Sequence, residues 1–249
     1  MPSDHLAGRV VLITGAASGI GLAVARRAAG EGAVIAAIDI DTDGLDQLAA
    51  EARAIDAPVA CRVVDIADPV ALTGAIDSLA EELGPLSVAH ANAGVLVQST
   101  PVEALDLDEW HRVLAIDLTG VLVTFQAALP HFGSDGGLLL ASGSSLAVRP
   151  GIGYLPYVAA KAGVHAIARS LALELAPRSI RVNVLAPGLT DTPMTRGVDG
   201  HIERQLPSVP LGELVDANDV AALAVHLMSD EARGITGSVF MVDGGRTAG

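Results

Sequence analysis

A tyrosine and a lysine near the middle of the chain have the types and the spacing that proton transfer requires. Tyr157 and Lys161 lie four residues apart in Tyr-Val-Ala-Ala-Lys, and on a helix this spacing puts both side chains on one face. A free tyrosine hydroxyl has a pKa of about 10, and a nearby ammonium group lowers that pKa because it favours the phenolate. The pair predicts a general acid or base at Tyr157, although an ordinary helix surface can carry the same two residues.

A serine upstream of this pair adds a hydroxyl group. Ser144 follows the apolar run Leu138-Leu139-Leu140-Ala141, which is typical of a buried strand. Polar chemistry in an open α/β sheet usually lies just beyond the strand ends. We therefore expect the Ser144 hydroxyl to hold a carbonyl oxygen close to Tyr157.

The composition and charge argue against several classes of partner. The chain has 249 residues, 51% of them hydrophobic, which suits one α/β domain over residues 1–249. A net charge of −14 argues against nucleic acid or an anionic membrane as partner. No apolar run reaches the roughly 20 residues of a membrane span, and no signal peptide is visible, so we expect a cytoplasmic protein. The single cysteine, Cys61, excludes an intrachain disulfide, and no residue spacing suggests a metal site.

A glycine-rich loop follows the first predicted strand, which covers residues 9–14. Gly15, Gly19 and Gly21 stand between this strand and a helical run over residues 22–30. Glycines allow a tight turn and a close approach of the backbone to a pyrophosphate, and the N–H groups at the helix start face the anion. The spacing differs from the G-x-G-x-x-G fingerprint, so the loop by itself also fits a plain connection between strand and helix.

An aspartate ends the second predicted strand, over residues 33–38. Asp39 lies eighteen residues after Gly21, where an acidic side chain can accept hydrogen bonds from the ribose hydroxyls of an adenosine. Its negative charge would repel a 2′-phosphate, and the next residues, Ile40 and Asp41, are not basic. The expected cofactor is therefore NAD(H) rather than NADP(H).

Strands and helices alternate along the rest of the chain. We expect strands over residues 60–64, 86–90, 138–141, 181–186 and 238–242, and helices over 42–55, 69–83, 107–131, 156–176 and 218–228. This alternation predicts a doubly wound parallel sheet of the Rossmann-like α/β class in a single domain. Residues 189–210 have little periodicity and read as a loop or short helices that act as a lid.

The ordered set of motifs resembles the short-chain dehydrogenase/reductase family, in its type of about 250 residues. The resemblance rests on the glycine loop, Asp39, Asp65, the stretch 91–94 and the set Ser144, Tyr157 and Lys161. It covers residues 8–245. Each motif is weak by itself, but their combination in this order is specific.

The resemblance implies roles for particular residues. Ser144, Tyr157 and Lys161 match the catalytic Ser, Tyr and Lys. Ser144 is chosen over Ser142 and Ser145 because its spacing of thirteen residues to Tyr157 agrees with relatives, and Ser142 could instead line the nicotinamide pocket. The family's adenine-contacting Asp and its neighbour match Asp65 and Ile66, while the NNAG stretch reads Ala91-Asn92-Ala93-Gly94 and lacks its first Asn. The implied cofactor-binding residues are Gly15, Ser18, Gly19, Ile20, Gly21, Asp39, Asp65, Ile66, Asn92, Ala93, Gly94, Tyr157, Lys161, Pro187, Gly188, Thr190 and Thr192.

One departure from the family concerns the catalytic machinery. Relatives carry Asn in a segment like N-L-T-G, and this chain has Asp117-Leu118-Thr119-Gly120. In the family this residue supports a helix bend and a water that relays protons to the lysine. A relay through the backbone carbonyl would survive with Asp117, whereas an ionised carboxylate cannot donate the hydrogen bond of an amide. Asp117 can also pair with Lys161 and change the pKa values around it.

The expected function is the interconversion of a secondary alcohol and a ketone with NAD(H), on a small-molecule substrate. The alternatives are a dinucleotide-binding protein with little or no catalysis, and epimerisation or dehydration on the same scaffold. Relatives pair their two long helices into tetramers, so the resemblance implies a homotetramer. We expect residues 189–210, with Leu96, Val97, Arg149, Ile152 and Tyr154, to shape the substrate pocket.

Overall fold

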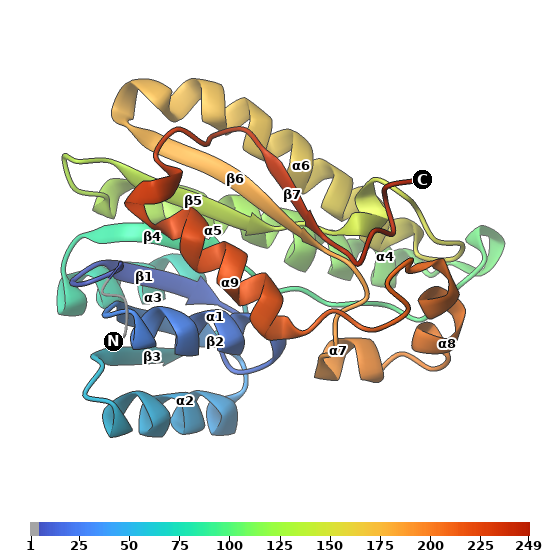
Figure 1. The fold of residues 1–249 in the computed structure, drawn as a ribbon, viewed down its shortest axis with the longest axis horizontal. Helices are drawn as coiled ribbons and strands as arrows, with labels where there is room; N and C mark the ends of the chain where they lie inside the picture. Colours follow the sequence, from blue (N-terminus) through green and yellow to red (C-terminus); the bar gives the residue numbers. More distant parts are fainter. Residues whose placement is uncertain (1–4) are drawn as a thin grey trace.

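Seven parallel strands form one sheet in the computed structural model, which describes residues 5–249 (Figure 1). The strand order is β3-β2-β1-β4-β5-β6-β7. This order reverses once, between β1 and β4, as in doubly wound sheets that bind ligands at the switch point. The predicted fold class is confirmed. The strands are β1 (Val10–Thr14), β2 (Val34–Asp39), β3 (Val59–Val63), β4 (Leu86–Ala91), β5 (Gly137–Ser142), β6 (Ile180–Pro187) and β7 (Val239–Val242).

Helices cover both faces of the sheet because successive side chains of each strand point to opposite faces. In β1, Val11 and Ile13 pack in the same cluster as residues of α1, α2 and α9, whereas Val10 and Leu12 pack with residues of α3, α5 and α6. The helices are α1 (Gly19–Gly30), α2 (Thr42–Ala54), α3 (Pro69–Leu83), α4 (Leu107–Leu114), α5 (Gly120–Ala128), α6 (Leu155–Leu175), α7 (Pro193–Arg196), α8 (His201–Gln205) and α9 (Ala217–Met228).

Aspartate caps fix where several of these helices start. Asp68 accepts backbone hydrogen bonds from Val70 and Ala71, and Pro69 takes the first position of α3. Asp41, Asp106 and Asp216 cap α2, α4 and α9 in the same way. Such a cap contributes about 1 kcal/mol. The predicted bounds of α3 are correct as a result, and the other long elements agree within about three residues, apart from the run over residues 107–131.

The long helical run predicted over residues 107–131 is not one regular α-helix. It contains a π-helical turn at Ala115–Thr119 between α4 and α5, and a short 3₁₀ turn at Leu129–His131. The pattern of apolar residues over this run does not indicate such a turn. By length and composition Leu107–His131 could cross a membrane, but Val121 and Phe125 are buried against the sheet, as in a core helix.

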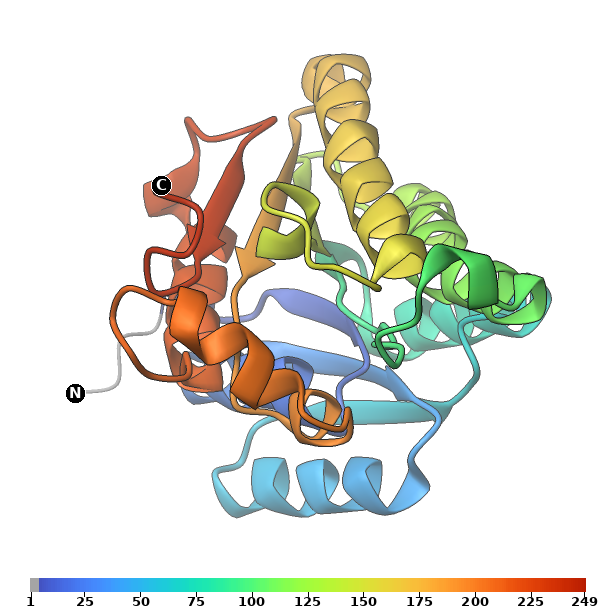
Figure 2. The same cartoon turned by 90° about the vertical axis from the view of Figure 1, so that its right-hand side faces the viewer.

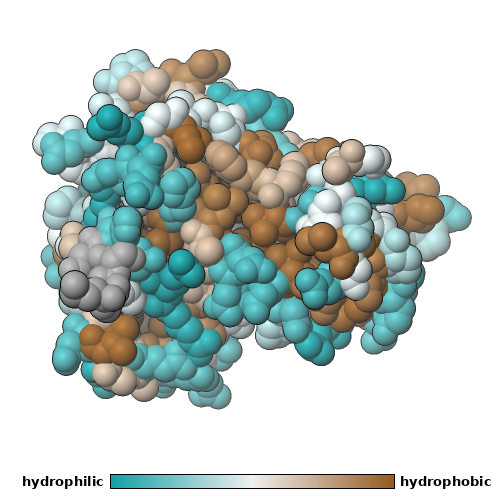
Figure 3. Space-filling model, in the orientation of Figure 1, coloured by the Kyte–Doolittle hydropathy of each residue, from teal (hydrophilic) through white to brown (hydrophobic). Residues whose placement is uncertain are grey.

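The edge of the sheet at β7 and the carboxyl ends of the strands differ in what covers them. In the view of Figure 3, apolar surface gathers over the edge at β7, whose four residues are all partly exposed. At the carboxyl ends of the strands, the segment predicted as a lid forms α7 and α8, which lie beside the end of the sheet (Figure 2).

Candidate active site

A single cavity brings most of the predicted site residues together at the carboxyl ends of the strands. Of the nineteen positions named as catalytic or cofactor-binding, two do not line it, Gly21 and Asp117. The lining residues come from the loops after β1 to β6 and from α6, α7 and α8. These residues come together because the carboxyl ends of parallel strands all lie at the same edge of the sheet.

The first loop of the cavity has the backbone that a pyrophosphate cradle requires. Gly15 and Gly19 have positive φ angles of 67° and 51°, which favour glycine. A side chain on Gly15 would also come within 2.8 Å of the Ala93 Cα atom. α1 starts at Gly19, so its free N–H groups lie at the loop.

Gly21 has a different role from the one predicted. It is buried and does not face the cavity. A Cβ atom here would overlap the carbonyl oxygen of Gly15 and lie 2.5 Å from the Asn92 side chain. Gly21 therefore allows α1 to pack closely against the loop.

Asp39 is held at the end of β2 by backbone donors. Its carboxylate accepts hydrogen bonds from the N–H groups of Ala17 at 2.9 Å, Ile40 at 2.7 Å and Asp41 at 3.0 Å. These bonds tie the carboxylate to the glycine loop and fix it as an acceptor at the cavity. Asp65, after β3, lies on the same wall and accepts from the Ala67 N–H group at 2.8 Å.

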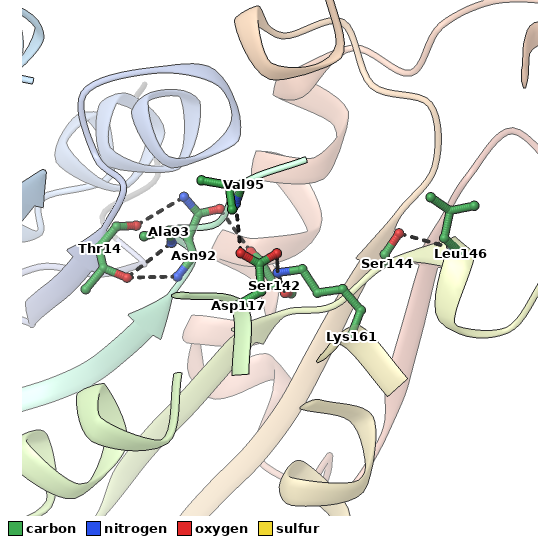
Figure 4. A network of polar contacts seen from close by, with 9 residues as sticks. All are labelled: Thr14, Asn92, Ala93, Val95, Asp117, Ser142, Ser144, Leu146 and Lys161. Atoms are coloured by element: carbon green, nitrogen blue, oxygen red, sulfur yellow. Dashed lines mark hydrogen bonds and ion pairs between the residues drawn. The ribbon is translucent and has the colours of Figure 1, made fainter. Parts of the chain in front are cut away.

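A hydrogen-bond network joins the ends of β1, β4 and β5 (Figure 4). The Thr14 hydroxyl accepts from the N–H groups of Asn92 and Ala93, and the Asn92 amide donates to the carbonyls of Thr14 and Gly15. The Ser142 hydroxyl donates to Asn92 Oδ1 at 2.9 Å. Asn92 therefore locks the glycine loop to the catalytic side of the cavity, although the first Asn of the family stretch is Ala91 here.

His90 extends this network into the core. Its Nε2 lies 3.1 Å from the Ser142 hydroxyl. Because Ser142 donates to Asn92, His90 Nε2 carries the proton, and Nδ1 is left without a partner among the described residues. Burial lowers the pKa of His90 to about 3, so it is a neutral core residue.

Lys161 is almost fully buried between three groups. Its Nζ donates to the Ser142 carbonyl at 3.0 Å, pairs with Asp117 Oδ2 at 3.5 Å and lies 5.5 Å from the centre of the Tyr157 ring. Burial opposes the charged form, but Asp117 and Tyr157 together raise the pKa of Lys161 above its usual value. Lys161 is therefore a fixed positive charge beneath Tyr157.

Tyr157 has a raised pKa despite this charge. Burial raises the pKa of its hydroxyl most, Lys161 lowers it, Asp117 raises it and the Ser144 hydroxyl lowers it. The prediction that Lys161 favours the phenolate is correct in direction. The low-dielectric surroundings and the second charge, Asp117, outweigh that effect, so the net shift is upward.

Ser144 is oriented by the backbone. Its hydroxyl oxygen accepts from the Leu146 N–H group at 3.1 Å, at the start of a short 3₁₀ turn. The hydroxyl proton is left to donate toward the cavity, which Ser144 lines. Ser142 also lines the cavity, but its hydroxyl donates its hydrogen bond to Asn92 Oδ1.

Asp117 lies behind Lys161, in the π-helical turn, and its side chain is fully buried. Oδ1 accepts from the Val95 N–H group at 2.8 Å, while Oδ2 has no hydrogen bond among the described residues. Burial raises the pKa of Asp117, and Lys161 lowers it. The turn thus inserts a carboxylate into the catalytic group, where it acts through Lys161 and Tyr157 and does not touch the cavity.

The loop after β6 closes the cavity on the other side. Gly188 donates its N–H to Val242, and a side chain on Gly188 would come within 2.5 Å of the Asp243 Cα atom. Thr190 donates to the Gly188 carbonyl at 3.2 Å, and Thr192 caps α7 by accepting from the Thr195 N–H group. With Pro187, these residues line the cavity at the predicted place.

Several lining residues were not named individually from the sequence. Among them, His201 and Gln205 come from α8, inside the segment 189–210 that was expected to shape the pocket, and Arg246 follows the glycine pair after β7. Their segments have no periodicity that places them, although a glycine pair straight after a strand signals a close approach of the backbone.

The prediction of the residues that shape the substrate pocket is correct only in part. The segment 189–210 does contribute to the wall, through residues such as Met194 and Gln205. Of the five residues named beside it, only Leu96 lines the cavity, whereas Ile152 is 94% exposed and Val97 packs against Val113 and Ala160. Tyr154 is buried behind the wall, with its hydroxyl 2.7 Å from His201 Nδ1. Arg149 acts on the wall from outside, through a hydrogen bond to the Arg246 carbonyl.

The comparisons with known proteins cover nearly the whole chain. A family model described as "Enoyl-(Acyl carrier protein) reductase" matches residues 15–247. The chain is 37% identical to a cis-4-hydroxycyclohexanecarboxylate dehydrogenase from Sinomonas cyclohexanicum, over 98% of this chain and 99% of that protein.

Solved structures agree with the fold in detail. A short-chain dehydrogenase from Burkholderia cenocepacia in complex with NADP has a TM-score of 0.93 and 35% identity, over 97% of this chain and 99% of that chain. A 3-ketoacyl-(acyl-carrier-protein) reductase from Brucella melitensis complexed with NADH has a TM-score of 0.90 and 30% identity, over 97% and 99%. The fold and the cavity therefore define a Rossmann-like oxidoreductase. The chain belongs to the short-chain dehydrogenase/reductase family.

Proposed function

We propose that this protein is an NAD(H)-dependent oxidoreductase that interconverts a secondary alcohol and a ketone. The observation that carries the proposal is one cavity with Ser144, Tyr157 and Lys161 on one wall and the glycine loop with Asp39 on another. The relative from Sinomonas is named for a substrate whose hydroxyl is a secondary alcohol, which supports the reaction class.

Each residue of the catalytic wall has a role that follows from its contacts. Ser144 donates its free proton to the substrate oxygen and holds it next to Tyr157. Tyr157 gives its proton to that oxygen in reduction and takes it back in oxidation. Lys161 supplies the fixed positive charge that favours the phenolate. The dinucleotide supplies or accepts the hydride.

The other walls fit a dinucleotide. Gly15 and Gly19 leave room for the pyrophosphate next to the start of α1, and Asp65 and Ile66 lie where the adenine would bind. Asp39 keeps acceptor capacity for ribose hydroxyls beyond its backbone donors. The residues that follow Asp39 in the sequence, Ile40 and Asp41, are not basic, so neither of them can bind a 2′-phosphate. We therefore assign NAD(H) as the preferred cofactor.

Fluorescence titration with NADH and NADPH tests the cofactor assignment. The wild type is expected to bind NADH tightly and NADPH weakly, and Asp39→Ala is expected to reduce that preference because it removes the repelling carboxylate. Equal binding of both cofactors by the wild type would overturn the role of Asp39. Failure to bind either would remove the hydride source and the whole proposal with it.

Turnover of a panel of secondary alcohols and ketones tests the reaction. Tyr157→Phe is expected to lower kcat by about 10²-fold or more while NADH binding stays nearly intact, because general acid–base catalysis is lost and the ring is kept. Turnover by Tyr157→Phe equal to the wild type would refute the role of Tyr157.

A second candidate is a dinucleotide-binding protein with weak catalysis. Asp117 favours it, since its carboxylate pairs with Lys161 and raises the pKa of Tyr157. This protein would bind NADH but turn over no member of the panel. The intact set of Ser144, Tyr157 and Lys161 makes the enzyme the better proposal, because binding alone does not need it.

We also propose that the protein assembles as a homotetramer. Leu173 on α6 is 83% exposed and Leu107 at the start of α4 is 65% exposed, and the β7 edge carries apolar surface (Figure 3). Light scattering after size exclusion is expected to give four times the chain mass of 25.2 kDa, or about 101 kDa. A mass of one or two chains would contradict the proposal.

A further inference from the structure

The end of the cavity formed by α8 and the segment after β7 contains a buried positive charge that the proposed reaction does not use. Arg246 is only 4% exposed, yet it lines the cavity. No carboxylate lies within ion-pair distance of it among residues 5–249. A buried charge without a counter-charge is costly, so such groups are normally paired.

The hydrogen bonds of Arg246 go to neutral acceptors. Nη1 donates to the Arg149 carbonyl at 2.7 Å, and Nη2 donates to Gln205 Oε1 at 3.2 Å. A guanidinium has five N–H donors, so these two bonds orient it and leave donors free. Burial lowers the pKa of Arg246 somewhat from its high usual value, which leaves it charged near neutral pH.

The carboxylate nearest in sequence is committed elsewhere. Asp243 accepts from the N–H groups of Gly245 and Thr247 and from the Thr247 hydroxyl. These bonds hold the tight turn through Gly244 and Gly245, both of which have positive φ. The turn aims Arg246 at the cavity without neutralising it.

His201 adds a second donor on the same wall. The Tyr154 oxygen accepts from Arg204 at 3.2 Å, so the Tyr154 proton is donated to His201 Nδ1, 2.7 Å away. His201 is then neutral with its proton on Nε2, which has no partner among the described residues. Burial, Arg204 and Arg246 all lower the pKa of His201, which agrees with a neutral ring.

Positive charge predominates at this end. Arg149, Arg204 and Arg246 converge on it, in a protein with a net charge of −14. The nearby carboxylate of Asp243 is engaged by the turn and does not line the cavity. The acidic residues that line the cavity, Asp39 and Asp65, lie at the end of β2 and just after β3, at the other end of the sheet order. The electrostatic field at the α8 end therefore favours an anion.

We propose that Arg246 and His201 bind a carboxylate on the substrate, so that the substrate is a hydroxy acid and the product a keto acid. Gln205 holds the guanidinium in place. The inference rests on the proposed function, since it names the class of alcohol that the same cavity takes.

A matched pair of ketones tests the inference. The wild type is expected to reduce 4-oxocyclohexanecarboxylate with a kcat/KM at least about 10-fold above that for 4-oxocyclohexanecarboxamide, which has the same shape but no charge. Arg246→Gln is expected to remove most of this ratio and Arg246→Lys to keep part of it. Arg233→Gln makes the same change at an exposed arginine outside the cavity and is expected to leave the ratio unchanged.

Binding without turnover separates this inference from the proposed function. Calorimetry with cyclohexanecarboxylate and cyclohexanecarboxamide, in the presence of NADH, is expected to show at least about 10-fold tighter binding of the acid by the wild type, and loss of that preference in Arg246→Gln. If the wild type turns over neutral ketones but shows no preference for the acid in rate or binding, the carboxylate site is wrong and the enzyme assignment stands. If no ketone is turned over but the acid is preferred in binding through Arg246, the site stands and the enzyme assignment fails.

Discussion

The two ends of the cavity are built in opposite ways. The end at Asp39 and the glycine loop comes from residues close together in the sequence, fixed by backbone hydrogen bonds and backbone contacts. The α8 end joins segments some forty to one hundred residues apart through side chains, as in the bonds of Arg246 to Arg149 and Gln205. The first end is acidic and the second basic. The difference shows that cofactor binding depends on local backbone geometry, whereas the substrate end depends on tertiary packing.

The largest expected effect comes from disturbing the backbone contact of the first end. Gly21→Ala would place a methyl group on the Gly15 carbonyl oxygen, and we expect a loss of about 3 kcal/mol or more in the free energy of unfolding, because a backbone contact cannot rotate away. Gly244→Ala at the other end has a φ of 60° and would meet the Val209 side chain, and we expect a loss of about 1–2 kcal/mol.

Urea denaturation measures both losses. Gly74→Ala is the control, since Gly74 lies in α3 with nothing within 4 Å of an added methyl group, and it is expected to gain up to about 1 kcal/mol. Equal losses in Gly21→Ala and Gly244→Ala would mean that the two ends are equally rigid.

A second effect concerns two buried histidines, His90 on β4 and His165 on α6, which do not line the cavity. Burial lowers the pKa of His90 to about 3 and that of His165 to about 4, so the unfolded chain takes up protons below its own pKa of about 6.5 and the folded protein does not. The contribution of these neutral histidines to the free energy of unfolding is therefore fully present above pH 6.5. It falls as the pH drops, by up to about 1.4 kcal/mol per pH unit for each histidine.

Urea unfolding at pH 7 and pH 5 measures this slope. Each of the variants His90→Asn and His165→Leu is expected to reduce this slope by up to about 1.4 kcal/mol per pH unit. Replacement of the exposed His111 by Gln serves as the control. A slope that is unchanged in both buried variants would contradict the assignment of these two histidines.

The smallest expected effect tests how Asp117 acts on Tyr157. Asp117→Asn keeps the acceptor for the Val95 N–H group but removes the charge that raises the pKa of Tyr157. Since alcohol oxidation needs the deprotonated tyrosine, the rise of kcat/KM with pH is expected to move to lower pH. A pH–rate profile measures the shift, and a movement to higher pH would show that Asp117 does not act through this charge.

Much of the fold and the first end could be predicted from the sequence because the signals are local. Asp68 followed by Pro69 marks the start of α3, and Asp39 ends an apolar strand at a fixed spacing from the glycines. The π-helical turn at Ala115–Thr119 has no signal in the local pattern of apolar residues, and only the family resemblance implies a helix bend at Asp117. The sequence does not predict that Arg246 and His201 share one wall, because they meet only when β7 and α8 fold against the same cavity.

The single reversal in strand order has a consequence for how the chain is made. β1, β2 and β3 are complete at residue 63, but β1 must wait for β4, which ends at residue 91, to cover its other edge. At about 5–20 residues per second, the 28 residues between them (91 − 63) take a few seconds on the ribosome. During that interval a nascent chain presents an open apolar strand edge, the kind of surface on which other chains pair. Pulse proteolysis of chains stalled just before and just after residue 91 would measure the protection that β4 brings.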